Sequence, residues 1–449
     1  MPEFRSARLT SLAAAAGLCL CGMARADVNT LTGWAVMPAA TFADGPTSGQ
    51  FITQNPYGTN TAPYLNQQPV QGFSGVLAGP GGSYRFLVDN GFGSQTNSAD
   101  SLLRAYAVLP DFKTATGGSG TVSAAGWNTG VAQATYDTAS RITLNDANRQ
   151  LGFTIQAEYT RYYNNAANPL VDGSIRAGRL LTGADLDTES MQKDKNGNLW
   201  FGDEFGPFLV KTNATGTVLR GEIGLPGVMA PQNPYLGGGT ANLGSSRGFE
   251  GMAVNKSGDR LYTLLEGTVP GDPSKSLRMN EFSVDSEAYT GLQYLYGLDA
   301  GGTNIGDMTA IDDHRFIVIE RNGGTATSGT PFKKVFVVDT TGVANGSFVK
   351  KTLLVDLMNV FDPNDLNGDG STVFTFPFVT IENVLLLDAN TLLVVNDNNY
   401  PYGGGRGNYS DNTEFLRISL ANPVPEPGTW ALMAGGLMLL WGAARRRQS

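Results

Sequence analysis

Acidic side chains recur along this chain in a fixed arrangement, and carboxylates in such numbers can bind cations and move protons. Five segments share one pattern, in which a leading polar residue is followed by a Gly/Asp/Asn turn and an apolar run that ends in a trailing acidic residue. The leading residues are Ser74, Glu189, Glu250, Asp307 and Glu382. The trailing residues are Asp89, Asp203 or Glu204, Glu266, Glu320 and Asp397.

Carboxylates brought close together cannot all ionise cheaply, because like charges repel, and a bound Ca²⁺ relieves that repulsion with six to eight oxygen ligands. The residues that we predict to bind the metal are Asp203, Glu204, Asp307, Glu320, Glu382 and Asp397. The residues that we predict to act in catalysis are Glu250, Glu266, Glu189, Arg247 and Arg321. The alternative is structural: the acids bond to backbone N–H groups of a neighbouring repeat, and the two Arg form salt bridges within the ring.

The elements that position these residues are hairpins, since leading and trailing members lie roughly 13–16 residues apart. A hairpin that repeats every ~57–75 residues is typical of a β-propeller. One interval, from 74 to 189, is longer and has room for a hidden blade. We therefore predict an all-β chain with six blades, within a range of five to seven. Equivalent positions would then form two rings around the central channel.

Other runs predict the remaining strands. Apolar stretches at 102–109, 334–339 and 352–357 are typical of outer strands, and 141–163 alternates as strands around a turn. A last strand over 414–420 is placed to close the ring by pairing with an early strand, which removes free sheet edges.

Several kinds of chemistry are disfavoured. The only histidine, His314, lies in a turn, so a Ser-His-Asp triad or a poly-His metal site has little support. The only cysteines, Cys19 and Cys21, lie in the first 26 residues. Hydrolysis by this chain would therefore use carboxylates with hard cations. The net charge of −9 at pH 7 argues against nucleic acid as a partner.

A second candidate for calcium is the loop Asp365-x-Asn367-x-Asp369-Gly370, which matches the first half of an EF-hand loop. Its twelfth position is Phe376 and not Glu, so the match is incomplete. The loop is either a calcium-stabilised segment or a turn rich in Asp and Asn.

The two ends carry export signals. Residues 1–26 combine early Arg residues, a short apolar run and a small-x-small cleavage site, which predicts a signal peptide. Residues 423–449 contain Pro-Glu-Pro, a short apolar run and three Arg, and they resemble the PEP-CTERM sorting tail of Gram-negative bacteria. The alternative is an ordinary single-span anchor. Both interpretations place the body, 27–422, outside the cytoplasm.

The motifs also carry a resemblance. DTESM…LWFGDEFGPFLVK, SRGFEGMAV…LYTLLEG, IGDMTAIDDHRFIVIERN and FPFVTIENV…LLVVNDNNYP are similar to the phytase-like family, described as "esterase-like activity of phytase". The resemblance spans about 70–420 and implies a β-propeller with phosphoesterase or esterase activity. Few lysines lie near the motifs, which argues against strong phytate binding.

We therefore expect an exported, calcium-dependent hydrolase of phosphate or carboxylic esters that acts in the channel. The alternatives are a propeller lactonase and a non-catalytic ligand-binding propeller of the cell envelope or exopolysaccharide matrix. The expected partners are a small anionic or ester substrate, the sorting protease that removes the tail, and exopolysaccharide. The expected location is the periplasm, cell envelope or exterior, with transient anchoring in the inner membrane.

Overall fold

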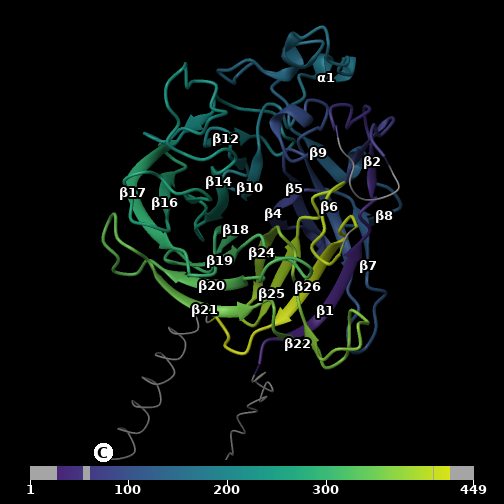
Figure 1. Ribbon diagram of the computed structural model, residues 1–449, viewed down its shortest axis with the longest axis vertical. Coiled ribbons are helices and arrows are strands. Elements are labelled where there is room, and N and C mark those ends of the chain that lie inside the picture. Colours follow the sequence, from purple (N-terminus) through teal and green to yellow (C-terminus); the bar gives the residue numbers. More distant parts are fainter. Residues whose placement is uncertain (1–27, 54–60, 408, 425–449) are drawn as a thin grey trace, which may run out of the picture.

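The computed structural model describes residues 28–53, 61–407 and 409–424, and this part of the chain is nearly all β. Its main strands form five blades of four antiparallel strands around a central axis, and a parallel pairing joins the first and last blades into one larger sheet (Figure 1). The inner strands of the blades contact each other in turn around the axis, and the last returns to the first. This closed ring confirms the predicted β-propeller.

Each blade contains four strands, numbered from the inside outward in the first four blades. Blade 1 is β4 (Phe73–Ala78), β5 (Tyr84–Val88), β6 (Arg104–Asp111) and β7 (Thr121–Ala125). Blade 2 is β10 (Thr188–Lys193), β11 (Leu199–Asp203), β12 (Phe208–Thr212) and β13 (Ile223–Gly224). Blade 3 is β14 (Phe249–Val254), β15 (Arg260–Leu265), β16 (Ser276–Ser283) and β17 (Ala288–Gly297). Blade 4 is β18 (Asn304–Ala310), β19 (Arg315–Arg321), β20 (Lys333–Asp339) and β21 (Lys350–Asp356).

Blade 5 joins the two ends of the body. It consists of β24 (Ile381–Asp388), β25 (Thr391–Asn396), β26 (Thr413–Ser419) and, outermost, β1 (Thr30–Met37). The antiparallel register of β1 and β26 runs from Thr30 opposite Ser419 to Met37 opposite Thr413. The predicted closure by 414–420 is therefore confirmed.

Short elements decorate the blades. The remaining strands are β2 (Phe42–Asp44), β3 (Gln67–Pro69), β8 (Ala132–Gln133), β9 (Arg141–Thr143), β22 (Val360–Phe361) and β23 (Val373–Phe374). The helical elements are η1 (Pro80–Gly82), η2 (Gln95–Asn97), η3 (Thr138–Ser140), η4 (Gln156–Glu158), η5 (Tyr162–Asn164) and α1 (Gly173–Gly178).

The core is divided among the gaps between blades. Inner strands such as β25 carry Leu and Val on both faces, because both faces pack against a neighbouring blade. Separate hydrophobic clusters fill the five gaps, for example Trp200, Leu209, Phe249 and Met252 between blades 2 and 3. Packing between blades thus holds the inner strands in place around the channel.

The propeller has five blades, within the predicted range of five to seven and one fewer than the preferred six. The long segment between blades 1 and 2 holds fewer strands than expected. Over 94–186 the described chain adds only β6–β9, short helices and loops, and no further inner strand. Of the strands expected in 141–163 only β9 forms, since side chains such as Asp146 bond to nearby backbone N–H groups and favour turns.

The predicted signal peptide and most of the predicted sorting tail lie outside the described residues. Within the described ranges, no helix is long and apolar enough to cross a membrane.

Candidate functional site

A β-bulge occurs at the same place in every inner hairpin. The register shifts between Phe73 and Val76, Thr188 and Ser190, Phe249 and Gly251, Ile305 and Met308, and Ile381 and Asn383. A bulge leaves one residue unpaired and re-aims its side chain. All five leading residues lie in these bulges, and three of them, Glu189, Glu250 and Glu382, line the channel cavity.

The strand pairing identifies equivalent positions. In blade 3, Phe249 pairs with Leu265, and the next residue on each strand is Glu250 and Glu266. The equivalent positions on the first inner strands are Ser74, Glu189, Glu250, Gly306 and Glu382. Those on the second inner strands are Asp89, Glu204, Glu266, Arg321 and Asp397. Blade 4 thus contributes a glycine and an arginine.

Three predicted metal ligands lie one residue away from these positions, and a shift of one residue turns a side chain to the other face of a strand. None of the three lines the channel cavity that the described residues form. Asp203 accepts hydrogen bonds from the backbone N–H groups of Asp187 (2.8 Å) and Gly206 (2.7 Å). Asp307 accepts them from Met308 (2.6 Å) and Val384 (2.8 Å), which ties blade 4 to blade 5.

The third, Glu320, is fully buried away from the channel. Its carboxylate accepts hydrogen bonds from the Tyr296 hydroxyl (2.7 Å) and the Asp299 backbone N–H (2.7 Å), and it pairs with Lys351. All three carboxylates are thus bonded to donors of the protein, and Asp307 bonds to a backbone N–H of a neighbouring blade, as the structural alternative describes.

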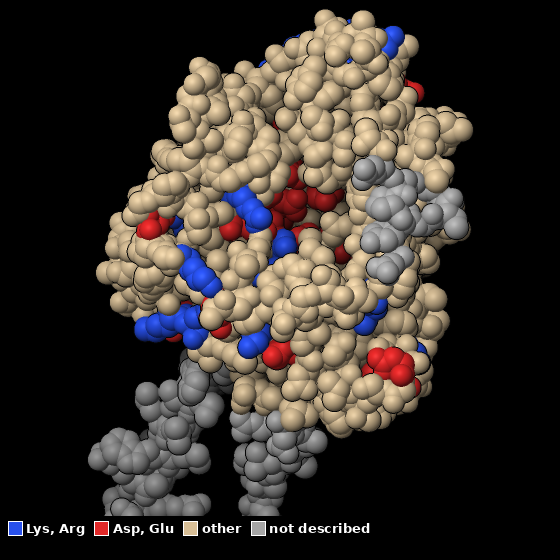
Figure 2. Space-filling view, viewed as in Figure 1, with Lys and Arg blue, Asp and Glu red and all other residues tan. Residues whose placement is uncertain are grey.

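The remaining predicted residues meet in one cavity of about 310 Å³ at the mouth of the channel. Figure 2 shows the acidic atoms gathered in the central hollow. Eight carboxylates and two guanidinium groups line it: Asp89, Asp187, Glu189, Glu204, Glu250, Glu266, Glu382, Asp397, Arg247 and Arg321. The formal excess is six negative charges.

Arg321 is the centre of one half of the cavity. Its Nη2 lies 2.9 Å from Glu250 Oε1, 3.2 Å from Glu266 Oε1 and 2.6 Å from Glu382 Oε1. These three carboxylates raise the pKa of Arg321, although its burial opposes them. Arg321, on blade 4, therefore acts as a built-in cation for carboxylates of blades 3 and 5.

Glu266 also contacts the rim of the channel. Arg247 Nη1 lies 2.6 Å from Glu266 Oε2, and the Asn304 amide donates to Glu266 Oε1 at 2.6 Å. The Arg247 side chain is 41% exposed, in contrast to 8% for Arg321. Arg247 is thus the guanidinium that an incoming ligand can reach.

In the part of the chain that the structure describes, no salt bridge joins Asp187, Glu189 or Glu204 to an Arg or Lys. Carboxylate oxygens of these three residues lie within 4.8 Å of one another, and Glu204 is equally close to Glu250 and Glu266. Asn90 donates a hydrogen bond to Asp187 (2.8 Å), and Glu204 Oε1 is buried with no hydrogen-bond partner among the described residues. An unpaired buried carboxylate oxygen beside two more carboxylates suits an oxygen-binding cation, so this cluster can bind a metal ion.

The pKa values of the cavity reflect its burial and crowding. Burial, followed by neighbouring carboxylates, raises the pKa of Asp89 and Asp397 to about 8. Burial raises the pKa of Glu382 to about 8 even though Arg321 opposes it. The same causes raise the pKa of Glu189 and Glu204 well above the ordinary value. Without a cation, the cavity would therefore hold protons near neutral pH.

Sequence reasoning left some cavity residues out of the predicted site. Asp187, Asn90 and Asn304 line the cavity and were not among the candidates. Asp187 lies two residues before Glu189, and the bulge between Thr188 and Ser190 brings both into one cluster. The pattern of alternation shows no such irregularity, so only the acidic character of the segment pointed to Asp187.

The loop at 365–370 lies between β22 and β23, away from the cavity. Asp365 accepts a hydrogen bond from the Gly370 backbone (3.0 Å), and Asp369 accepts one from Ser371 (2.8 Å). Phe376, at the twelfth position, is buried in the core. The observed bonds are those of a turn rich in Asp and Asn. His314 is exposed in the β18–β19 turn, as the sequence indicated.

Fold and site together define a five-bladed β-propeller with an acidic cavity at one mouth of its channel. The chain belongs to the family described as "Phytase-like: Esterase-like activity of phytase", whose profile matches residues 68–400. The PEP-CTERM protein-sorting motif matches residues 423–448 and indicates export with a C-terminal sorting signal. Both predicted resemblances are therefore confirmed.

Solved structures with propeller-like folds are similar to this chain at low identity. A luciferin-regenerating enzyme is 10% identical with a TM-score of 0.34, over 87% of this chain and 92% of the other. The PQQ-bound aldose sugar dehydrogenase of Streptomyces coelicolor is 10% identical with a TM-score of 0.30, over 88% and 100%. A GH43 β-1,3-galactosidase is 8% identical with a TM-score of 0.37, over 78% and 59%. No curated protein matches the sequence.

Proposed function

We propose that this protein is an exported, cation-dependent hydrolase of phosphate or carboxylic esters, and that the acidic cavity is its active site. The observation that carries the proposal is the division of the cavity. One half has its own cation, Arg321, and the other half is a carboxylate cluster with an unpaired oxygen on Glu204. Membership of the phytase-like family supports the reaction class.

The cluster of Asp187, Glu189 and Glu204 fits a divalent cation. The fit is to a hard cation such as Ca²⁺ because every donor is oxygen. A bound cation there would polarise the ester and lower the pKa of a water. Glu382 and Asp397, which we also predicted as ligands, line the cavity across from the cluster and can bind a second cation or the substrate through one.

The protein's own groups then have separate tasks. Hydrolysis joins a water oxygen to the phosphorus or carbonyl carbon of the ester and breaks the bond to the alcohol oxygen. Glu250 or Glu266 accepts the proton of that water, and burial, which raises the pKa of Glu250, makes Glu250 a stronger base once ionised than an ordinary carboxylate. Arg247, at the rim, binds the charge that develops on the substrate.

The cellular setting follows from the sorting motif. We propose that the protein is anchored in the inner membrane by its tail until a sorting protease releases it to the envelope or exterior. Exopolysaccharide is the partner that we propose at that location, and we expect no nucleic acid to bind in the acidic channel.

The test measures whether the purified body, residues 27–422, hydrolyses each of four compounds in calcium and in chelator. The compounds are p-nitrophenyl phosphate, p-nitrophenyl acetate, phytate and a sugar lactone. We expect calcium-dependent turnover of at least one ester, and a loss of about 10²-fold or more in Glu250→Gln. Asp369→Asn, in the distant loop, is the matched control and should keep full activity.

Turnover that chelator leaves unchanged, or none of any ester, would overturn this proposal. Faster turnover of the lactone than of the esters would instead support the lactonase alternative.

A further inference from the structure

A second pocket of about 330 Å³ lies beside the channel, on the loops that follow blades 1 and 2. Its walls combine rings and amides, from Phe153, Tyr159, Tyr163, Gln156 and Gln232. The volume is that of a site for one small ring-shaped ligand.

The charge of the pocket is low, in contrast to the channel. Asp185 is the one charged side chain among the described residues that line it. Its carboxylate already accepts hydrogen bonds from the backbone N–H groups of Gln156 (2.6 Å) and Thr182 (2.8 Å). Without Lys, Arg or His in its walls, the pocket offers an anion no counter-charge, so its chemistry favours a neutral ligand.

Two amides of the pocket each have one buried atom without a hydrogen-bond partner among the described residues. Gln156 is 4% exposed, and its Nε2 is buried with no hydrogen-bond partner among the described residues; the same holds for Gln232 Oε1. An unpaired buried donor or acceptor is costly, and a ligand that supplies the missing bond recovers that cost. One donor and one acceptor beside aromatic rings match the hydroxyls and apolar faces of a sugar ring.

The pocket shares a wall with the channel. The Gln232 amide donates to the Ser245 hydroxyl and, at 3.4 Å, to that of Ser246, and both serines line the acidic cavity. Asp185 lies two residues before Asp187, a member of the carboxylate cluster. A ligand that spans this wall would put its ring in the pocket and its ester in the cavity.

We infer that this pocket is a subsite for an uncharged sugar ring, and that the hydrolase acts on esters carried by sugars. The second statement rests on the proposed function, whereas the first does not. The ring would stack on Tyr159, and its hydroxyls would bond to Gln156 and Gln232.

Binding is measured first, without any reaction, by saturation-transfer NMR of the body with methyl glucoside, methyl galactoside and methyl mannoside. We expect at least one of them to bind, and Gln156→Met or Tyr159→Ala to weaken that binding about fivefold or more. Gln156→Met should leave the melting temperature equal or higher, because it removes an unpaired buried donor. A merely structural role of Gln156 would lower it instead.

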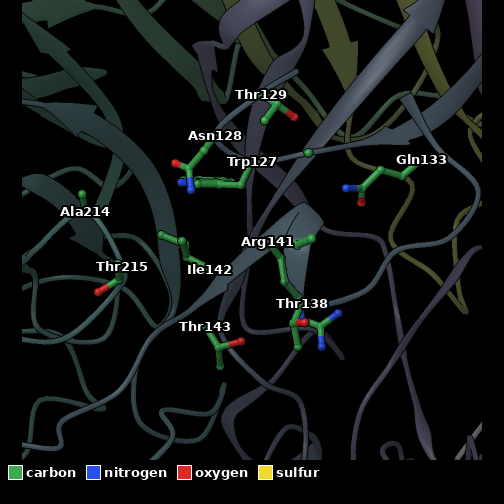
Figure 3. Close-up of a pocket in the computed structure, with 12 residues that line it drawn as sticks. Trp127, Asn128, Thr129, Gln133, Thr138, Arg141, Ile142, Thr143, Ala214 and Thr215 are labelled. Carbon is green, nitrogen blue, oxygen red and sulfur yellow. The ribbon is translucent and has the colours of Figure 1, made fainter. Parts of the chain in front are cut away.

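A control amide lies in the larger pocket of about 570 Å³ on blade 1, lined by Trp127, Gln133, Arg141 and Thr143 (Figure 3). Gln133 Oε1 is likewise buried without a partner among the described residues. Gln133→Met should leave sugar binding unchanged. Failure of all three glycosides to bind, or an equal loss in Gln133→Met, would overturn the subsite.

The link to catalysis is a second measurement. Gln156→Met should raise KM for the hexose phosphate of the sugar that binds, and leave KM for p-nitrophenyl phosphate unchanged. An equal change for both substrates would overturn the claim about sugar esters while sugar binding stands. No hydrolysis by the wild type, with sugar binding intact, would overturn the proposed function and leave the sugar subsite.

Discussion

Blade 4 and the other four blades meet the channel with opposite chemistry. At the two equivalent positions the others present carboxylates, with Ser74 as one exception, whereas blade 4 presents Gly306 and Arg321. Arg321 forms salt bridges with carboxylates of blades 3 and 5. Among the described residues, no Arg forms a salt bridge with Asp187, Glu189 or Glu204, the carboxylate cluster of blade 2. The comparison shows how one propeller can hold a fixed cation on one side of its channel and leave the other side for an exchangeable one.

The glycine of blade 4 has a steric reason. A Cβ at position 306 would lie 1.9 Å from the backbone oxygen of Ile381 in blade 5, which no side chain tolerates. Blades 4 and 5 therefore approach closely at this level. Because Gly306 contributes no side chain, the Arg321 side chain, at the equivalent position on the second inner strand, has the space to reach blades 3 and 5.

The largest effect on stability is expected from removing the guanidinium of Arg321. Arg321→Met should lower the free energy of unfolding by about 3–5 kcal/mol at pH 8, because it leaves Glu250, Glu266 and Glu382 buried without their cation. The loss should be smaller at pH 5, where Glu250 and Glu382, whose pKa values are raised by burial, take up protons instead. Urea unfolding at the two pH values measures both.

Arg278→Met is the matched control, since Arg278 pairs with Asp272 away from the channel. It should cost no more than about 1 kcal/mol. Equal losses in the two variants would mean that Arg321 is an ordinary ion pair and that blade 4 is not special.

This exception also marks the limit of prediction from sequence. The five hairpins and the closure by β26 could be predicted because each depends on a local run of apolar residues and a turn. Whether Asp307 or Gly306, and whether Glu320 or Arg321, occupies the channel position depends on a bulge and on the strand register. A shift of one residue in the register moves the other residue of each pair to the channel. Glu250 and Glu382 line the cavity as expected from the bulges of their strands, and Glu266 and Asp397 do so directly after the second strand of the same hairpins. The exact blade count needed the structure of the long interval after blade 1.

A smaller effect on stability is expected from changing the pH and from adding calcium. Asp89, Glu382 and Asp397 have pKa values raised to about 8, against about 4 for an unfolded carboxyl. Between these values the folded state binds more protons than the unfolded state, so metal-free stability is full below about pH 4 and falls as the pH rises through 8. Each proton is worth about 1.4 kcal/mol per pH unit in that window. We expect calcium to raise the melting temperature by more at pH 8 than at pH 5.

Scanning calorimetry in calcium and in chelator checks this expectation. Binding at a hundredfold excess over Kd would add about 2.7 kcal/mol, a shift of a few degrees for a chain of this size. Equal melting temperatures in calcium and chelator at pH 8 would show that the cavity binds no calcium and would count against the proposed metal site.

The smallest effect on calcium binding is expected from replacing Glu320, a blade 4 carboxylate that lies outside the channel cavity. Glu320→Gln removes a charge that is fully buried and bonded to Tyr296, Asp299 and Lys351, so it should lower stability in calcium and in chelator alike. The difference between the two melting temperatures, which reports calcium binding, should therefore equal that of the wild type. Glu204→Gln makes the same chemical change on the channel side, where Oε1 has no partner among the described residues, and it should abolish the difference. A calcium response that is lost in Glu320→Gln and kept in Glu204→Gln would place the cation behind blade 4, and the division of the channel into a fixed and an exchangeable half would be wrong.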